Sequence, residues 1–166
     1  MQKYVEIAKE LGAVNARIIS SAEIYFDRRA ILKCLWGCEF HLNNEAMKCG
    51  ARGLNFEECR GSVKTYHKIL LVHNYEATDL SKIVLKIERR AFLDGYYFAF
   101  AVRACHVCRT CKAIDQEICA MPEKIRPCEA AFGIDVYKTV RELGLPCDPL
   151  QSKEETQNRY GFVLID

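Results

Sequence analysis

The chain has 166 residues, the size of one typical domain, and half of them are hydrophobic. With 28% charged residues, the composition excludes a disordered chain, a collagen-like chain and a coiled coil. The net charge of +2 gives no general electrostatic case for binding nucleic acid or an anionic membrane. The unusual feature is the ten cysteines, which are the residues most informative about function.

The first third of the chain predicts one helix followed by two strands. The helix covers residues 2–11, where apolar side chains share one face, and the strands cover 16–20 and 23–33. A cysteine loop over 34–49 follows, with one helical turn at 43–47. A helix over 54–64, beginning near Asn55, completes this part.

The rest of the chain alternates strands, helices and loops. A buried strand at 66–74 precedes a helix at 80–93, capped by Thr78 or Asp79, and a strand at 96–103 runs into a second cysteine loop, 105–128. Helices at 122–131 and 134–143, a polar loop at 151–159 and a last strand at 160–165 follow.

These elements predict a single α+β (or α/β) domain spanning residues 1–166. We expect a mixed sheet of four to five strands with helices packed on one face. The strand, helix and strand of 66–103 form a plausible βαβ unit. Both cysteine loops lie at strand ends, where a rigid scaffold positions functional loops.

The protein is expected to be cytoplasmic and outside the membrane. The N-terminus has no apolar signal core, and the longest strongly apolar run, Tyr96–Val102, is far shorter than the roughly 20 residues of a membrane span. Cytosolic thiols are kept reduced, so dense cysteines indicate metal binding. Disulfides, as in a hyperthermophile cytosol, are the weaker alternative because these cysteines cluster at ligand spacing.

The second cysteine group is the stronger metal signal. Its spacing is C-x2-C-x2-C-x7-C, formed by Cys105, Cys108, Cys111 and Cys119. Three cysteines at successive x2 spacing wrap around one cuboidal iron–sulfur cluster, as in bacterial ferredoxins, whereas zinc more often uses two separated CxxC pairs. Iron–sulfur is therefore favoured over zinc, and the x7 spacing leaves the partition of ligands open.

The first group is Cys34, Cys38 and Cys49, which can hold three corners of a cluster or be three buried thiols. Two four-thiolate clusters need eight cysteines, and the two groups supply seven. The remaining cysteines are more simply ordinary thiols, although one could be the eighth ligand: Cys59, Cys128 or Cys147. Otherwise one cluster has an open iron corner.

For other residues near the cysteines, a role at the metal site competes with a purely structural one. Trp36 either shields a cluster from water or only packs, and His41 and His106 are more simply structural than ligands. Glu88-Arg89-Arg90 is predicted to be a charged helix face without chemistry. The basic residues by the second loop either offset cluster charge, meet an acidic partner or form a solvated face: Arg103, Arg109, Lys112 and Lys124. No phosphate loop, GxGxxG, GxSxG or HExxH motif is present.

Four strings taken together resemble one known family. They are Lys33-Cys34-x3-Cys38, Glu88-Arg89-x-Ala91-Phe92-x2-Gly95-Tyr96-x2-Ala99-Phe100, the second cysteine group with Pro122, and Gly133-Ile134-Asp135-Val136 before Thr139-Val140-Arg141. In this order they are similar to the predicted metal-binding family catalogued as domain of unknown function 2284, common in anaerobic archaea and bacteria. The resemblance covers residues from about 15 to 146.

The resemblance implies metal binding of iron–sulfur type, without a settled reaction. The positions that match are Cys34, Cys38, Cys49, Cys105, Cys108, Cys111 and Cys119. Two departures stand out. The family tends to have Cys-Pro-Pro where this chain has Cys49-Gly50-Ala51, and it often has a small hydroxyl residue where this chain has Cys128. The second departure suggests that Cys128 is an extra ligand here.

We therefore expect an iron–sulfur protein for electron transfer, or a cluster-carrying subunit of a redox assembly. It would hold one or two [4Fe-4S] clusters and meet a redox partner protein, but no nucleic acid and no membrane. Two alternatives remain open: an enzyme that uses a [4Fe-4S] cluster with an open iron site, and a zinc-stabilised interaction module.

Overall fold

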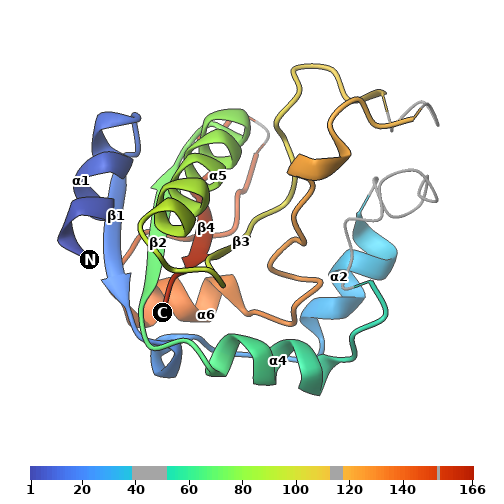
Figure 1. Cartoon of the computed structure of the whole chain (residues 1–166). Helices are drawn as coiled ribbons and strands as arrows, with labels where there is room; N and C mark the ends of the chain where they lie inside the picture. Colours follow the sequence, from blue (N-terminus) through green and yellow to red (C-terminus); the bar gives the residue numbers. More distant parts are fainter. Residues whose placement is uncertain (39–51, 113–117, 153) are drawn as a thin grey trace.

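The computed structural model of the chain describes residues 1–38, 52–112, 118–152 and 154–166. One four-stranded sheet runs in the order β1 (Asn15–Ile19), β2 (Ile69–Asn74), β4 (Arg159–Leu164), β3 (Phe100–Val102). All neighbouring strands are antiparallel, so the sheet is not the mixed one predicted. β2 and β3 run parallel to each other with β4 between them, and α5 (Ala77–Leu93) connects them (Figure 1). The predicted α+β class is confirmed.

Helices cover both faces of the sheet, not one face as predicted. α1 (Gln2–Glu10) and α5 pack on one face, against Leu70 and Val72 of β2. α4 (Phe56–Lys64) and α6 (Val136–Glu142) contribute to the core on the other face, with Ile69 and Leu71 of the same strand. The period of two along β2 divides its side chains between the two cores. No helix in the described parts of the chain is long and apolar enough to cross a membrane.

The predicted strand at 23–33 is wrong. A short 3-10 turn, η1 (Ser21–Glu23), leads instead into the helix α2 (Ala30–Gly37). The Asp27 carboxylate accepts the backbone N–H of Arg29 at 2.8 Å, which forms the turn before the helix. Apart from the single bridge of Phe26 to Ile134, the segment makes no strand pairing among the described residues. The residues with high helix propensity that follow then favour a helix: Ala30, Leu32, Lys33 and Leu35.

Three further boundaries differ from the predictions. The predicted strand at 96–103 shortens to β3, because Gly95, with φ of 99°, ends α5 and residues 96–99 form a turn. The helix predicted over 122–131 is only the 3-10 turn η3 (Pro122–Lys124), followed by the turn of 129–133. α5 itself begins at Ala77, after Glu76, and not near residue 80. In Figure 1, α1 and α2 lie on opposite sides of the molecule, and the cysteine segment after β3 rises on the α2 side.

Candidate metal centre

The four cysteines of the second group lie in the segment that leaves β3. Their side chains are all partly exposed. Burial raises the pKa of the Cys105 thiol, and the charges of Cys108, Cys119 and Cys111 raise it further. The backbone N–H of Val107 donates a hydrogen bond to the Cys105 sulfur, which favours the thiolate. The structure thus brings the sulfurs of Cys108, Cys111 and Cys119 within electrostatic reach of the Cys105 sulfur.

The described residues do not by themselves assemble a complete ligand set. Among the described residues, no group of three or more Cys, His, Asp or Glu side chains is arranged to hold a metal ion. The predicted ligand Cys49 and the nearby His41 lie outside the described residues. The ligand set predicted from the sequence therefore stays a prediction.

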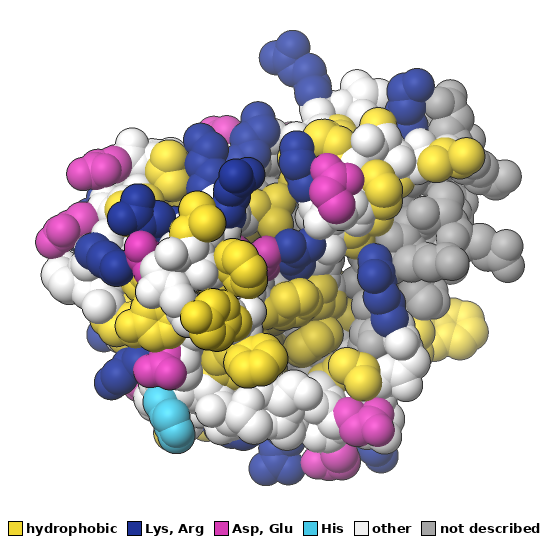
Figure 2. Space-filling view, in the orientation of Figure 1, with side chains coloured by type: hydrophobic (Ala, Val, Ile, Leu, Met, Phe, Trp, Pro, Cys, Tyr) yellow, Lys and Arg dark blue, Asp and Glu magenta, His cyan; other side chains and the backbone are white. Residues whose placement is uncertain are grey.

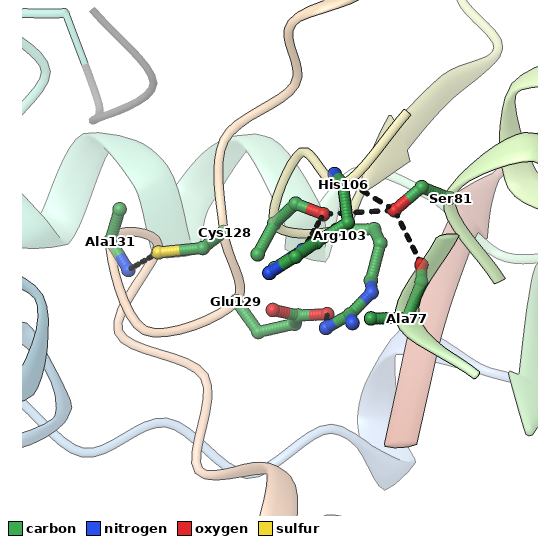
Figure 3. A network of polar contacts seen from close by, with 8 residues as sticks. Ala77, Ser81, Arg103, His106, Cys128, Glu129 and Ala131 are labelled. Carbon is green, nitrogen blue, oxygen red and sulfur yellow. Dashed lines mark hydrogen bonds and ion pairs between the residues drawn. The ribbon is translucent and has the colours of Figure 1, made fainter. Parts of the chain in front are cut away.

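α5 fixes the beginning of the cysteine segment through Ser81. The Ser81 hydroxyl lies 3.0 Å from the carbonyl oxygen of Ala77 and 3.1 Å from that of Ala104, so it donates to one of the two. It also accepts the backbone N–H of His106 at 3.2 Å. Because Ala104 and His106 flank Cys105, one buried hydroxyl fixes the backbone on both sides of the first cysteine (Figure 3).

Glu88 of α5 fixes the far end of the same segment. Its carboxylate forms an ion pair with Arg126, with Nε at 2.8 Å from Oε2, and accepts the backbone N–H of Ala101 at 2.6 Å. The hydrogen bonds that Arg126 donates to Glu88 raise the pKa of the Arg126 guanidinium, and the charge of Cys105 adds to the effect. A permanent positive charge therefore lies within electrostatic reach of Cys105.

A buried ion pair connects the two halves of the site. Arg103, which follows β3, places Nη1 at 3.5 Å from Oε1 of Glu129, and the two side chains are only 10% and 9% exposed. Burial raises the pKa of Glu129, while the charge of Arg103 lowers it. The Arg103 Nε has no hydrogen-bond partner in the described part of the chain. Figure 3 shows this pair between the His106 backbone and Cys128.

The first cysteine group is only partly described. Cys34 is buried on α2, with 4% exposure, and Cys38 is partly exposed at the C-cap of the same helix. The Cys128 thiol forms a hydrogen bond with the Cys34 thiol, and this contact raises the pKa of Cys128. The backbone N–H of Ala131 donates to the Cys128 sulfur at 3.3 Å. A cysteine from the second half of the chain thus lies against the first group.

The remaining predicted residues have ordinary positions. Cys59 and Cys147 are buried in the core with β2 and β4, apart from either group. Trp36 is 78% exposed on α2. The interpretation of Arg103 as part of a solvated face is wrong, because its side chain is buried with Glu129.

The sequence pattern did not point to three residues that hold the cysteine segments in place: Ser81, Glu88 and Glu129. Glu88 belongs to one of the family-like strings and Glu129 directly follows Cys128. Those positions were the only available signals, since the partners of both carboxylates lie far away along the chain.

A family model described as predicted metal-binding protein, DUF2284, matches residues 17–165. The chain belongs to this family. No curated protein and no solved structure matches the chain at a significant level. Family membership and ten cysteines together make this a cysteine-rich member of a predicted metal-binding family, which confirms the resemblance seen in the sequence.

Proposed function

We propose that this protein binds an iron–sulfur cluster through Cys105, Cys108, Cys111 and Cys119 and transfers electrons. The observation that supports the proposal most is that Cys108, Cys111 and Cys119 lie within electrostatic reach of Cys105, in a segment held at both ends by α5. The donor set is all sulfur, which suits iron–sulfur clusters and other soft metals. When bound, the cluster supplies one-electron redox chemistry.

The surroundings of the four thiols suit a site whose net charge is negative. The Arg126 guanidinium lies within electrostatic reach of Cys105, and Glu88 holds it in place. The N–H of Val107 donates to the Cys105 sulfur. Hydrogen bonds to the sulfurs and nearby charges are among the factors that set the reduction potential of a cluster. Arg126 is therefore expected to raise that potential.

The redox partner is proposed to be an acidic electron-carrier protein that docks beside this segment. Lys82, Lys86 and Arg89 share one exposed face of α5, and none of them forms an ion pair with a described residue. Arg109 and Lys124 add exposed positive charges from the cysteine segment. Figure 2 shows Lys and Arg side chains gathered over α5 and this segment, with a few acidic ones among them. A positive surface steers a negatively charged partner toward the site.

The electron-transfer proposal is tested by reduction and reoxidation of the protein isolated without oxygen. We expect the visible absorption to bleach with dithionite and to return on reoxidation, and Cys108→Ser to abolish it. Cys147→Ser, which changes a thiol buried elsewhere, is the matched control and should keep the absorption. Colour that survives in Cys108→Ser, or that does not respond to reductant, would contradict the proposal.

The docking proposal has its own test. The rate of reduction by an acidic electron carrier should fall steeply with ionic strength and should drop in the double variant Lys86→Glu with Arg89→Glu. Arg60→Glu, on α4 at the opposite face of the sheet, is the control and should leave the rate unchanged. Equal rates in all three proteins would argue against this surface.

A further inference from the structure

A pocket lined by aromatic residues lies between the C-terminal ends of α4 and α5. Its volume is about 570 Å³, within the usual range of small-molecule sites. No lysine, arginine or histidine of the described residues lines it. Four of its lining residues are aromatic and one is acidic: Tyr66, Tyr96, Tyr97, Phe98 and Asp166. Figure 2 shows hydrophobic side chains gathered on this face, between the end of α5 and α4.

Two of the aromatic residues are unusually exposed for their size. Tyr97 is 74% exposed and Phe98 is 84% exposed, in the turn that joins α5 to β3. The ring of Tyr97 packs edge-on against that of Phe92, with 6.3 Å between the ring centroids. Phe92 and Leu93, at the end of α5, are exposed as well. A contiguous exposed apolar area of this kind is typical of a binding site.

A hydrogen bond and a ring contact hold the walls of the pocket in place. The Tyr66 hydroxyl donates to the carbonyl oxygen of Phe98 at 2.6 Å, so the Tyr66 ring spans from the end of α4 to the turn after α5. The ring of Tyr96 packs edge-on against that of Tyr4 on α1, with 6.3 Å between the centroids. Because these rings are already fixed, a ligand would bind them with little loss of side-chain entropy.

The electrostatics of the pocket favour a cation. The faces of aromatic rings carry negative potential, and the Asp166 carboxylate forms no ion pair with a described residue. Three basic side chains near the pocket are engaged elsewhere. Nζ of Lys64, in the last turn of α4, donates to backbone carbonyl oxygens at η1 and its C-cap. Lys3 and Arg90 both form ion pairs with Asp94.

We propose that this pocket binds a small molecule that carries a methylated ammonium group. The methyl groups of such a cation pack against aromatic rings while its charge interacts with their faces, and the Asp166 carboxylate supplies the counter-charge. A metal ion or a primary ammonium group would instead lose hydration that the rings cannot replace. The pocket is separate from the second cysteine group, since Tyr97 and Phe98 precede β3 and Cys105 follows it. The inference therefore goes beyond the proposed function and does not depend on the metal.

The test is isothermal titration calorimetry of the full chain, isolated without oxygen, with two probes of the same shape. One is choline, and the other is its uncharged isostere, in which a carbon atom replaces the quaternary nitrogen. A difference in affinity between the two reports the contribution of the charge. We expect choline to bind about 5–30-fold more tightly than the isostere, the effect of one or two cation–π contacts.

Variants of the pocket locate the binding site. Tyr97→Leu and Phe98→Leu each keep an apolar side chain but remove a ring, so each should weaken choline binding about 3–10-fold and change the binding of the isostere little. Asp166→Asn should weaken choline binding and reduce its dependence on ionic strength. Tyr137→Leu, which removes an exposed tyrosine on α6, is the matched control and should bind choline like the wild type.

Equal affinity for choline and for its isostere would overturn the inference, because the pocket would then be only an apolar surface. So would a lack of choline binding in the millimolar range, or an equal loss of affinity in Tyr97→Leu and Tyr137→Leu. Iron and acid-labile sulfide are measured on the same preparations. A wild type that contains no iron but binds choline would contradict the proposed function and support this inference, and an iron–sulfur protein that does not bind choline would do the reverse.

Discussion

Replacing Arg103 by methionine should destabilise the fold strongly, because it leaves the Glu129 carboxylate buried without its partner. The two side chains are only 10% and 9% exposed, so water cannot replace the lost guanidinium. Breaking a buried ion pair on one side costs about 3–5 kcal/mol in the free energy of unfolding. Methionine keeps most of the apolar stem of arginine, which limits any additional loss from packing.

The assay is urea unfolding of four proteins: wild type, Arg103→Met, Glu129→Leu and the double variant. With a urea dependence of roughly 2 kcal/mol per molar, a loss of about 4 kcal/mol lowers the midpoint by about 2 M. The double variant should recover most of that loss, since replacing a whole buried pair by apolar side chains is often neutral. The coupling energy from this cycle measures the pair directly.

The exposed pair of Arg60 with Glu57 provides the matched control. Its side chains are 51% and 63% exposed at a separation of 3.3 Å, so Arg60→Met should cost less than about 1 kcal/mol. If Arg103→Met costs no more than Arg60→Met, the buried pair does not hold the two cysteine segments together. A double variant as unstable as Arg103→Met would also refute the reasoning.

Three further predictions concern other contacts of the fold. Gly133→Ala should cost about 2–4 kcal/mol in urea unfolding, because its φ is 71° and an added Cβ would lie 2.5 Å from the Phe56 ring. Gly144→Ala, with the same φ and nothing within 4 Å, should cost only about 1–2 kcal/mol, and equal losses would contradict the clash. Ser81→Ala should lower the free energy of unfolding by about 1–3 kcal/mol, measured by thermal unfolding, because the backbone groups of Ala104 and His106 lose a buried hydrogen-bond partner. Ser62→Ala, which removes an exposed hydroxyl, is the control, and an equal loss of stability in the two variants would contradict the role of Ser81. Finally, Asp94 accepts hydrogen bonds from Lys3 at 2.8 Å and Tyr4 at 2.9 Å, which lower its pKa to about 2. Its stabilising effect is present above the ordinary carboxyl pKa and is lost as the pH falls toward 2, so Asp94→Asn should lack this part of the acid-induced loss. Parallel acid titrations of stability for the two proteins would contradict the assignment.

Elements with a strong local pattern were predictable from the sequence. α1 and β2 show the helical and buried-strand patterns that define them, and α4 begins after Asn55, whose side chain accepts the N–H groups of Glu57 and Glu58 at 2.9 Å and 3.0 Å. These features depend on neighbours within a few residues. Pattern reasoning therefore finds them without knowledge of the tertiary structure.

The segment at 23–33 shows where such reasoning fails. Its β-branched and aromatic residues Ile24, Tyr25 and Phe26 favour a strand, yet only Phe26 pairs, and its partner Ile134 lies in the second half of the chain. The turn at Asp27 and the good helix formers after it determine the outcome. This local turn and the helix propensity after it outweighed the strand preference of the residues before them.

The candidate site likewise has features that are local in the sequence and features that depend on the folded structure. The spacing of Cys105, Cys108 and Cys111 is local and points to one site directly. The contact of Cys34 with Cys128 and the ion pair of Arg103 with Glu129 join residues from different parts of the chain. No periodicity or spacing rule identifies such pairs, because their members lie far apart along the chain.

Metal and sulfide analysis of the wild-type protein, isolated without oxygen and read with its visible spectrum, tests the central claim most directly. An iron–sulfur protein should contain about four or eight irons per chain with matching acid-labile sulfide, and a broad absorption near about 400 nm. A colourless protein with one or two zinc ions per chain, which unfolds when a chelator removes them, would contradict the proposed function.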